Sequence, residues 1–539
     1  MSTARVAGLA VLVSLTSFFY YLRHGDILMH GDAVAHINIA RRVFDSLTPG
    51  PLGLGTVWLP LPHLLMIPFL LSNKMWQSGA GGSFPSMIAY IFGVVGIFRL
   101  MRGLLESNPQ TQPGARMGAW VAAFAYGANP NLIYMQATAL TETLYLVFFI
   151  WALVYFAEFF RDSEEDGNAS DVARRALRQC AYCVGCAELA RYDGWFLAGV
   201  MGATVIALAI RRWDDRVFRR TALRFLLGVS IAPVLWLVYN AAVYGNALEF
   251  ANGPYSAKAI ELRVGAPNPG FHNLWVAASY FLKSAQTNSA VANWGRFWLL
   301  AAILATLVAL WFLRSKAAPI WLLLWAPLPF YTYSVAYGSV PLHVPTWWPF
   351  AIFNQRFGLE LLPLFAISAG LLVVVVSANL RATQPWKLAA VAIALMVASY
   401  AFVWRANPLC WQEAFNSWEM RRGLDTSVER VLTQLPPDSR YLMDLGEHVG
   451  IMERLGIPLR RVVNQENHRP WKRPADPDGI WERALSDPGR YVDFVIAFEG
   501  DSVDRSVNRT NLTLLTVIHS LNRPPARIYA TQRALNQSR

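Results

Sequence analysis

Long uncharged blocks of apolar residues constrain this chain more than any other feature. Of its 539 residues, 55% are hydrophobic and only 15% are charged, whereas ordinary globular chains carry roughly 25% charged residues. A helix that crosses a bilayer needs about 17–25 mainly apolar residues. Eleven blocks meet or approach that length, at about 5–23, 85–104, 117–135, 140–160, 177–192, 194–212, 222–243, 296–313, 317–337, 356–377 and 387–404. The sequence therefore predicts a mainly α-helical, polytopic membrane bundle of about eleven transmembrane helices, and it excludes a soluble enzyme and a disordered scaffold.

Basic residues in the short connecting loops predict how the bundle is oriented. Lys and Arg gather in the loops at about 100–116, 161–177, 211–224, 314–316 and 378–387, which hold most of the net charge of +12. Because short cytoplasmic loops are enriched in Lys and Arg, this pattern places the N-terminus in the cytoplasm and the C-terminus outside. The positive charge is thus a signal of topology, and we expect no nucleic-acid partner.

The longer polar segments then fall on the outer face. They lie at about 24–84, 244–295, 338–355 and 405–539, and they contain all nine histidines. Polar chemistry is therefore expected on the extracytoplasmic side. The sequence predicts a transmembrane domain over residues 1–404, with amphipathic helices in the first outer loop at 24–84.

The tail, residues 405–539, differs in composition from the rest of the chain. Short β-like runs at 441–443, 491–498 and 512–518 alternate with helical runs at 449–455 and 480–485. That alternation predicts a small extracytoplasmic α/β domain. Its His468, Trp471 and Lys472 could bind an acceptor, and a plain cover over an active cavity is the alternative.

An acidic residue opens an amphipathic helix in the first outer loop. His30-Gly31-Asp32 precedes apolar residues at helical spacing, which predicts a helix lying along the membrane surface to about residue 46. Asp32 has two interpretations, because Asp is among the best helix N-caps and is also a functional carboxylate at the membrane interface. The following stretch at 58–65 contains two prolines and predicts a rigid turn.

Further short motifs share the outer side of the membrane with Asp32. They are Leu59-Pro60-Leu61-Pro62-His63, Leu140-Thr141-Glu142-Thr143-Leu144, Ala190-Arg191-Tyr192-Asp193-Gly194-Trp195 and Asn354-Gln355-Arg356-Phe357. In order and placement, residues 1–404 resemble the GT-C superfamily of integral-membrane glycosyltransferases, in particular its protein O-mannosyltransferase and lipid A aminoarabinose transferase-like branch. The chain departs from that branch at Ala33, where relatives typically carry a second acidic residue. The tail lies outside the resemblance.

The resemblance implies transfer of a sugar from a polyprenyl-phosphate donor to an extracytoplasmic acceptor, with inversion at the anomeric carbon. It makes Asp32 the general base, and it implies membrane lipid, the lipid-linked donor and a glycan, lipid or protein acceptor as partners, in a bacterial inner membrane. The chemistry of the transfer reaction also requires a cation and a base at the site. A lipid phosphate leaves well if a cation holds it, whereas the acceptor hydroxyl needs a base within hydrogen-bond reach.

Three cations are candidates to bind the donor phosphate. Arg356 stands at the outer end of an apolar block, and its planar fork suits phosphate oxygens. Arg191 and Lys258 lie in other outer segments. The alternatives are interfacial anchors for the two arginines and a solvated loop residue for the lysine.

Three further residues are candidates to contact the substrate or acceptor, namely Glu142, His36 and His63. Glu142 begins an apolar block, where a carboxylate is costly unless it meets a cavity or a partner. We expect the similar Glu188 to pair with Arg191. Asp32 and His36, four residues apart, could share a divalent metal ion, but two ligands are too few to predict one, so the metal stays open and no other cofactor is expected.

Two other functions remain open from the sequence. An O-antigen ligase or polymerase-like enzyme would rely on Arg and His in a late outer loop, which gives no role to the early Asp32. A lipid-linked glycan transporter or flippase would be expected to show symmetric halves, and no internal repeat is visible.

Overall fold

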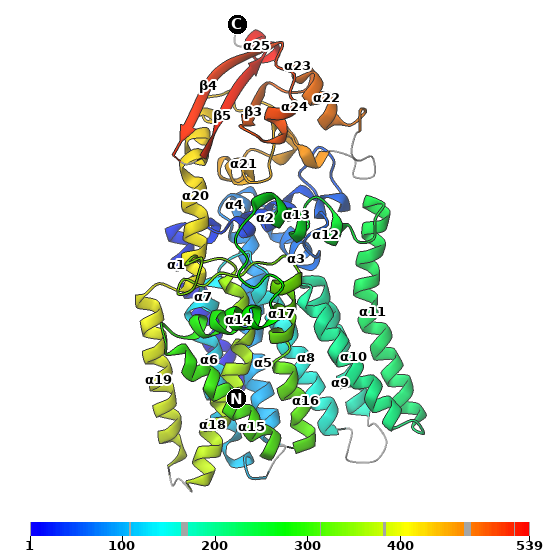
Figure 1. The fold of residues 1–539 in the computed structure, drawn as a ribbon, viewed down its shortest axis with the longest axis vertical. Coiled ribbons are helices and arrows are strands. Elements are labelled where there is room, and N and C mark those ends of the chain that lie inside the picture. The colour runs from blue at the N-terminus through cyan, green and yellow to red at the C-terminus, as the bar shows by residue number, and fades with distance from the viewer. Residues whose placement is uncertain are drawn as a thin grey trace.

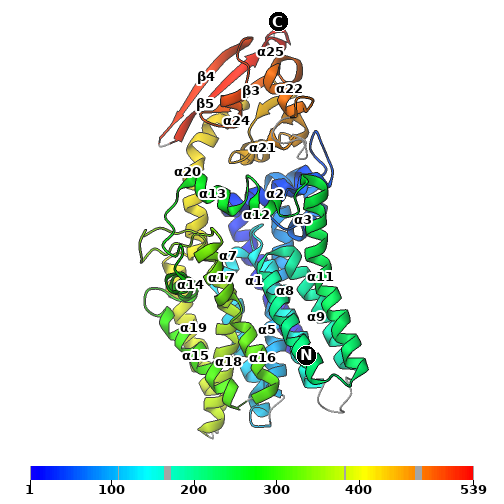
Figure 2. The ribbon, with the colours of Figure 1, turned by 45° about the vertical axis from the view of Figure 1, so that its right-hand side comes forward.

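The computed structural model shows a long helical bundle, capped at one end by short helices and a small sheet (Figures 1 and 2). It describes residues 2–106, 109–162, 171–312, 314–380, 384–467, 476–521 and 523–537. Among these, seven helical segments are long and apolar enough to cross a membrane: α1 (Ser2–His24), α5 (Ala80–Glu106), α8 (Glu142–Asp162), α10 (Asp193–Arg211), α11 (Arg216–Tyr244), η4 with α18 (Gln355–Leu361 and Leu362–Asn379), and the segment beginning with α19 (Pro385–Arg405). Together they make the chain an integral membrane protein.

Shorter or more polar helices complete the bundle. They are α6 (Ala115–Gly127), α7 (Pro130–Met135), α9 (Asp171–Ala190), α14 (Leu274–Ser289), α15 (Gly295–Phe312), α16 (Arg314–Leu324) and α17 (Pro327–Tyr337), with the single turn η3 (Gln112–Gly114) before α6. All eleven predicted blocks contain helix, but two are broken. The block at 117–135 divides before Pro130 and the block at 317–337 divides before Pro327, because proline cannot continue the hydrogen-bond ladder of a helix. The predicted count of about eleven transmembrane helices is therefore not confirmed.

The positions of the helix ends show at which end of the bundle each loop lies. The ends that adjoin the five short basic loops lie at the end of the bundle opposite the C-terminal sheet (Figure 1). Those loops therefore share one side, as the sequence predicts. The outer end carries η1 (Asp26–Leu28), α2 (Gly31–Arg42), η2 (Pro51–Leu54), α3 (Leu61–Leu70), α4 (Asn73–Gln77), α12 (Glu249–Asn252) and α13 (Ala257–Val264). The first outer loop thus supplies a platform of short helices above the bundle.

A mixed sheet lies at the top of the molecule, in what we call the C-terminal region (residues 409–537). Its five strands are arranged β2-β1-β3-β5-β4; the first three are parallel and the last three antiparallel. The strands are β1 (Tyr441–Met443), β2 (Val462–Val463), β3 (Phe494–Phe498), β4 (Leu512–Ser520) and β5 (Arg523–Thr531). Their helices are α20 (Leu409–Leu432), α21 (Val449–Leu455), η5 (Leu459–Arg461), η6 (Gln465–Asn467), α22 (Ile480–Ser486), α23 (Pro488–Tyr491), α24 (Ser502–Ser506) and α25 (Gln532–Gln537).

Successive side chains of a strand point to opposite faces of the sheet, so this region has a core on each face. Tyr441 and Met443 face α20 and α21 in a core continuous with the bundle, whereas Leu442 faces α22 on the other side. The sheet is therefore sandwiched between helices, and its inner face rests on the membrane part through α20 and α21.

The C-terminal region contacts α2 through a hydrogen bond between buried polar side chains. Glu453 of α21 accepts a hydrogen bond at Oε2 from Asn38 Nδ2 of α2 (2.6 Å), and Asn38 Oδ1 accepts one from Trp76 Nε1 (3.1 Å). Glu453 is fully buried, and its Oε1 has no hydrogen-bond partner among the described residues. Burial raises the pKa of Glu453 to about 8, against the smaller lowering effects of the Asn38 hydrogen bond and of Arg454 and Arg421.

This raised pKa predicts that stability falls as pH rises. Between the ordinary pKa of a glutamate and about 8, the folded protein keeps a proton on Glu453 that the unfolded chain has lost, so unfolding is favoured progressively across that window. We expect Glu453→Gln, which keeps the Asn38 contact and cannot ionise, to remove a loss on the order of 3 kcal/mol across this range. Thermal unfolding in detergent at about pH 5 and about pH 8 measures it, with the exposed Glu447→Gln as the control. An unchanged pH slope in Glu453→Gln would show that the group is not buried as a neutral acid.

Candidate active site

Asp32 is the second residue of α2, and its side chain does not cap that helix. His30 is the N-cap, because its Nδ1 accepts a hydrogen bond from the backbone N–H of Asp32 (3.1 Å). The Asp32 carboxylate is therefore released from the capping role and accepts a hydrogen bond from Arg356 Nη2 at 2.6 Å. The N-cap interpretation of Asp32 is therefore wrong, and its role as a functional carboxylate stays a prediction.

Arg356 joins four segments that are far apart in the sequence. It lies in η4, just after Asn354, whose left-handed backbone (φ 57°) an asparagine tolerates well. Besides Asp32, its guanidinium donates to Glu142 Oε1 (2.9 Å) and to Glu413 Oε1 (2.6 Å). Each nitrogen thus faces a different carboxylate, from α2, α8 and α20.

Arg191, between α9 and α10, forms the second centre of the network. Its Nη1 donates to Thr141 Oγ1 and to Glu142 Oε1, both at 3.1 Å, and its Nε donates to Asp193 Oδ2 at 3.0 Å. Glu142 therefore bridges Arg191 and Arg356.

A tyrosine and a phenylalanine complete this second centre. The Tyr331 hydroxyl accepts from Arg191 Nη2 (2.9 Å) and lies 2.9 Å from Asp193 Oδ2 and 2.7 Å from Glu360 Oε1. The Phe357 ring lies about 5 Å from both guanidinium carbons, 5.2 Å for Arg191 and 5.1 Å for Arg356. Both cations are therefore held by aromatic as well as acidic partners.

Asp32 is the most solvent-exposed carboxylate of the network. The Asp32 side chain is 38% exposed, whereas those of Glu142, Glu413 and Arg356 are 8% exposed or less. One oxygen each of Glu142, Glu360 and Glu413 is buried and has no hydrogen-bond partner among the described residues. Two guanidinium groups thus face five carboxyls, and Asp32 is the member that a substrate can reach directly.

Electrostatics keeps Asp32 ionised. Burial alone would raise its pKa, but Arg356, with His30, His36 and Arg421, outweighs burial, and the pKa lies below its ordinary value. Asp32 is therefore a carboxylate at neutral pH, ready to accept a proton but a weaker base than a free Asp.

The structure brings together four of the predicted site residues: Asp32, Glu142, Arg191 and Arg356. Lys258 is exposed near the start of α13 and forms no hydrogen bond or ion pair with this cluster among the described residues. His36 and His63 are buried against one another, with His36 Nδ1 2.9 Å from His63 Nε2. Burial lowers the pKa of His36 to about 4, so it is neutral at physiological pH. Substrate contacts by Lys258, His36 and His63 stay predictions.

Four residues of the network were not singled out from the sequence: Asp193, Tyr331, Glu360 and Glu413. Glu360 interrupts an apolar block as Glu142 does, so the same signal was available. Asp193 stands inside a quoted motif, whereas Glu413 lies in the polar tail and carries no signal of its own. The predicted pairing of Glu188 with Arg191 is wrong, because Arg191 pairs with Glu142, Asp193 and Glu360.

Metal ligands do not gather in the described part of the chain. No group of three or more His, Cys, Asp or Glu side chains there could hold a metal ion, and Asp32 and His36 share no such group. His468, Trp471 and Lys472 lie outside the described residues, so their predicted contact with an acceptor stays a prediction.

Two cavities differ in their lining, and neither is lined by a residue of the charged network. An apolar groove of about 630 Å³ runs between α3, α5, α8 and α9, and is lined by Leu64, Ile88, Leu144 and Phe148 among others. A cavity of about 400 Å³ lies between α2, residues 54–58, α13 and the C-terminal region. Its lining is mixed and includes Asn38, Arg42, Trp58, Arg263 and Asn464.

Comparison with known proteins identifies the fold. No protein-family model matches the chain, and no curated protein matches it. Among solved structures, ArnT from Cupriavidus metallidurans bound to undecaprenyl phosphate aligns with a TM-score of 0.55 over 98% of this chain and 98% of ArnT, at 14% identity. The oligosaccharyltransferase AglB from Archaeoglobus fulgidus, in complex with an inhibitory peptide and a dolichol-phosphate, aligns with a TM-score of 0.51 over 99% of this chain and 74% of AglB, at 12% identity. The same archaeal enzyme tethered to an acceptor peptide gives 0.52.

Both relatives are GT-C glycosyltransferases, and the alignments extend over nearly the whole of this chain, including the tail that the sequence resemblance left out. Identities this low show the fold alone. The chain has the GT-C fold of these membrane glycosyltransferases.

Proposed function

We propose that this protein transfers a sugar from a polyprenyl-phosphate donor to an extracytoplasmic acceptor, with Asp32 as the general base and inversion at the anomeric carbon. One observation carries the proposal: Asp32 is the exposed carboxylate of the charged network, whereas Glu142 and Glu413, which share Arg356 with it, are buried. An apolar groove on α8 and a mixed cavity beside α2 could receive a lipid-linked donor and an acceptor respectively.

The apolar groove supports a lipid donor. Leu144, in its wall, is two residues after Glu142, so one end of the groove lies at the height of the charged network but on another side of α8. Its other walls include exposed side chains of α3 and α5, such as Leu64 and Ile88, on the outer surface of the bundle. ArnT was solved with undecaprenyl phosphate and AglB with dolichol-phosphate, which supports a polyprenyl chain as the occupant.

The mixed cavity, whose lining includes polar side chains, supports an acceptor with a polar group. Ala35, in its wall, lies three residues after Asp32 on α2, and the Trp58 ring reaches inward to 4.5 Å from the ring of His36. Amide, guanidinium and aromatic side chains around an apolar floor are typical of sites that orient a small polar group. Lys258 belongs to α13, whose Ile260 and Arg263 line this cavity, and its predicted contact with the donor phosphate stays a prediction.

The reaction follows from this placement. The acceptor hydroxyl oxygen attacks the anomeric carbon from the face opposite the phosphate, and the bond from that carbon to the phosphate oxygen breaks as the new bond forms. The phosphate leaves with the bonding electron pair, and the hydroxyl proton passes to Asp32. Arg356, held by Glu142 and Glu413, fixes the position of Asp32 through their hydrogen bond. A contact of Arg356 or Arg191 with the phosphate must use the few N–H groups that carboxylates leave open.

The proposal includes a location. The basic loops gather at one end of the bundle, so the positive-inside rule places that end in the cytoplasm and the C-terminal region in the periplasm of a bacterial inner membrane.

The covalent fate of the sugar tests the proposal. Purified protein is reconstituted in liposomes with a polyprenyl-phosphate donor carrying a labelled sugar, together with candidate glycan, lipid and peptide acceptors. We expect label on one acceptor class and an equal amount of free polyprenyl phosphate. Intact labelled donor that only changes leaflet would instead identify a flippase. Joining of preassembled glycans without any use of a monosaccharide donor would identify a ligase or polymerase.

A substitution in the groove separates lipid binding from chemistry. Ile88 lines the groove and is 49% exposed, so Ile88→Trp fills space without disturbing the core. We expect the KM for a long polyprenyl donor to rise about tenfold, which corresponds to the loss of about two buried methylene groups. A donor with a short lipid should be unaffected. The control is Ile231→Trp on α11, with 57% exposure and no place in the groove; equal effects of both substitutions would show that the groove does not hold the donor.

A further inference from the structure

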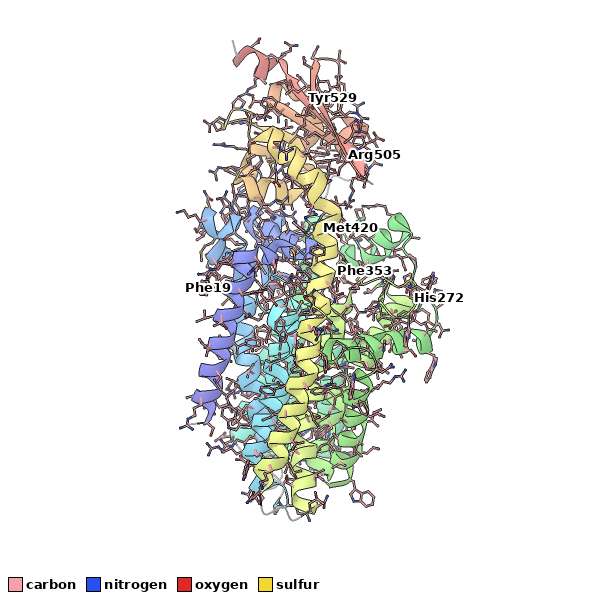
Figure 3. All side chains as sticks on the ribbon, turned by 90° about the vertical axis from the view of Figure 1, so that its left-hand side faces the viewer. Phe19, His272, Phe353, Met420, Arg505 and Tyr529 are labelled. Atoms are coloured by element: carbon pink, nitrogen blue, oxygen red, sulfur yellow. The ribbon has the colours of Figure 1, made fainter. Side chains whose placement is uncertain are left out.

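Large apolar side chains are exposed on one side of the bundle, around α14. They belong to the N-terminal half of α14, to residues 271–273 before it and to the loop at 347–353, and we call this surface the aromatic face. Its most exposed members are Trp275 (82%) and Phe350 (69%). In Figure 3, His272 of this face lies out to the side of the bundle. Exposed apolar patches of this kind mark a surface that a membrane or a partner covers.

The aromatic face lies near the level at which the membrane-spanning helices end. In Figure 3, His272 stands at about the height of Phe19, an exposed residue near the outer end of the membrane-spanning helix α1. The chain leaves α14 through a short connection into α15, an apolar helix that carries the exposed side chains of Leu300 and Leu304. Trp294 is exposed just before the first turn of that helix. The aromatic face is therefore continuous with a surface that lipid tails can cover.

The sequence around the aromatic face contains no acidic residue. No Asp or Glu occurs between Glu261 and Glu360, whereas Lys283 and Arg296 both belong to the outer part of that stretch. The Lys283 ammonium lies 6.0 Å from the centre of the Trp347 ring. Amphipathic aromatic rings settle at headgroup level, and anionic headgroups attract cations. Composition and continuity with α15 therefore both favour a lipid surface as the occupant of this face.

Helix α14 connects the aromatic face with the segment that carries Arg356. In its first half, the Tyr280 hydroxyl donates a hydrogen bond to the carbonyl of Trp348 (2.5 Å). In its second half, Asn288 Nδ2 donates to the carbonyl of Gln355 (2.7 Å). The same helix thus holds the exposed loop at one end and the residue before Arg356 at the other.

We propose that the aromatic face is embedded in the outer leaflet at headgroup level, so that the membrane itself holds α14 and, through it, the segment that carries Arg356. The apolar groove assigned to the lipid donor is lined by residues of other helices, so the aromatic face contacts bulk lipid and not the donor. Phe and Trp rings gain free energy when they leave water, and a Trp N–H at this depth still reaches water or a headgroup.

Spin labels measure the depth of the aromatic face directly. The half-buried Cys183 and Cys186 are first replaced by Ser, which leaves only buried native cysteines. Single cysteines are then introduced by Trp275→Cys and Phe350→Cys and labelled, and the protein is reconstituted in liposomes. We expect both labels to collide with oxygen, which concentrates in lipid, in preference to a water-soluble nickel chelate.

Two exposed leucines supply the reference positions for these labels. Leu235→Cys lies on the membrane-spanning helix α11 and reports lipid, whereas Leu514→Cys lies on β4 of the C-terminal region and reports water. Labels on the aromatic face that behave like the one on β4 would place the face in water and overturn the proposal. Labels shielded from both reagents would overturn it as well, because a second copy or another protein would then cover the face.

An acidic substitution tests the connection to the site. Phe350→Glu places a carboxylate at the proposed headgroup level, and we expect it to lower sugar transfer in proteoliposomes several-fold, whereas the apolar Phe350→Leu and the distant Leu514→Glu should not. An unchanged rate in Phe350→Glu would show that lipid contact does not hold the Arg356 segment. This measurement rests on the proposed function, but the spin labels report depth without turnover. A failure of transfer in the unaltered protein would therefore count against the proposed function and not against the embedding.

Discussion

We expect Asp32→Asn to lose the proposed sugar transfer while leaving a folded protein that still binds the lipid-linked donor. The side-chain amide of this variant keeps an oxygen that accepts the Arg356 hydrogen bond, so the network stays assembled. The amide cannot take a proton from the acceptor hydroxyl, however, and the absence of a positioned general base costs about 10²–10⁴ in rate. Initial rates in proteoliposomes, with donor binding measured separately on the same preparation, test this expectation.

An Asp in the same loop provides the control for this substitution. Asp26 lies outside the charged network, and its carboxylate accepts a hydrogen bond from Trp411 Nε1 (3.0 Å), which an Asn oxygen can also accept. Asp26→Asn should therefore transfer at close to the wild-type rate. Full activity of Asp32→Asn would remove the base from the mechanism and leave Asp32 as a structural partner of Arg356.

Replacing Arg356 with Gln has the second large effect, because it damages stability and catalysis together. Glu413 is buried and loses the guanidinium bonded to it, so that among the described residues only His30 remains as a basic neighbour, whereas Glu142 keeps its ion pair with Arg191. Breaking a buried ion pair in this way costs about 3–5 kcal/mol of stability. The main force that lowers the pKa of Asp32 is also lost, so that pKa rises. Because the proposed transfer needs Asp32 as a carboxylate, we expect the acidic limb of the rate profile to move to higher pH.

Thermal unfolding in detergent and the pH dependence of kcat/KM measure the two effects separately. The control is Arg99→Gln, since Arg99 pairs with Glu158 at an exposed site (47% for the arginine side chain), where a salt bridge contributes only about 0.2–1 kcal/mol. A stable Arg356→Gln protein with an unshifted acidic limb would mean that other groups set the charge of Asp32.

The membrane part of the fold could be read from the sequence because hydrophobic length is a strong signal there. The apolar blocks all contain helix, and the errors fall where a proline divides a block, as at Pro130 and Pro327. The C-terminal region was harder to predict. Its short elements at β1, β3 and α21 follow their local patterns, but β5 begins with Arg523-Pro524-Pro525, which is unfavourable in a strand, and the pairing to β3 and β4 supplies the structure instead.

The same contrast explains which site residues could be predicted. Asp32, Glu142, Arg191 and Arg356 are charged residues at the margins of apolar blocks, where a charge is costly and signals a function. Glu413 and Arg421 belong to α20, a helix of mixed composition in which acidic and basic residues are common. Only tertiary packing brings α20 against the start of α2, and no local pattern encodes that contact.

A structure of the protein with a non-hydrolysable polyprenyl-phosphonate sugar is the most direct test of the proposed transfer. We expect the lipid chain in the groove lined by Ile88 and Leu144, with the anomeric carbon facing the Asp32 carboxylate. Clear density for the sugar-phosphonate away from Asp32, with the groove empty or filled by an unrelated lipid, would contradict the proposed transfer.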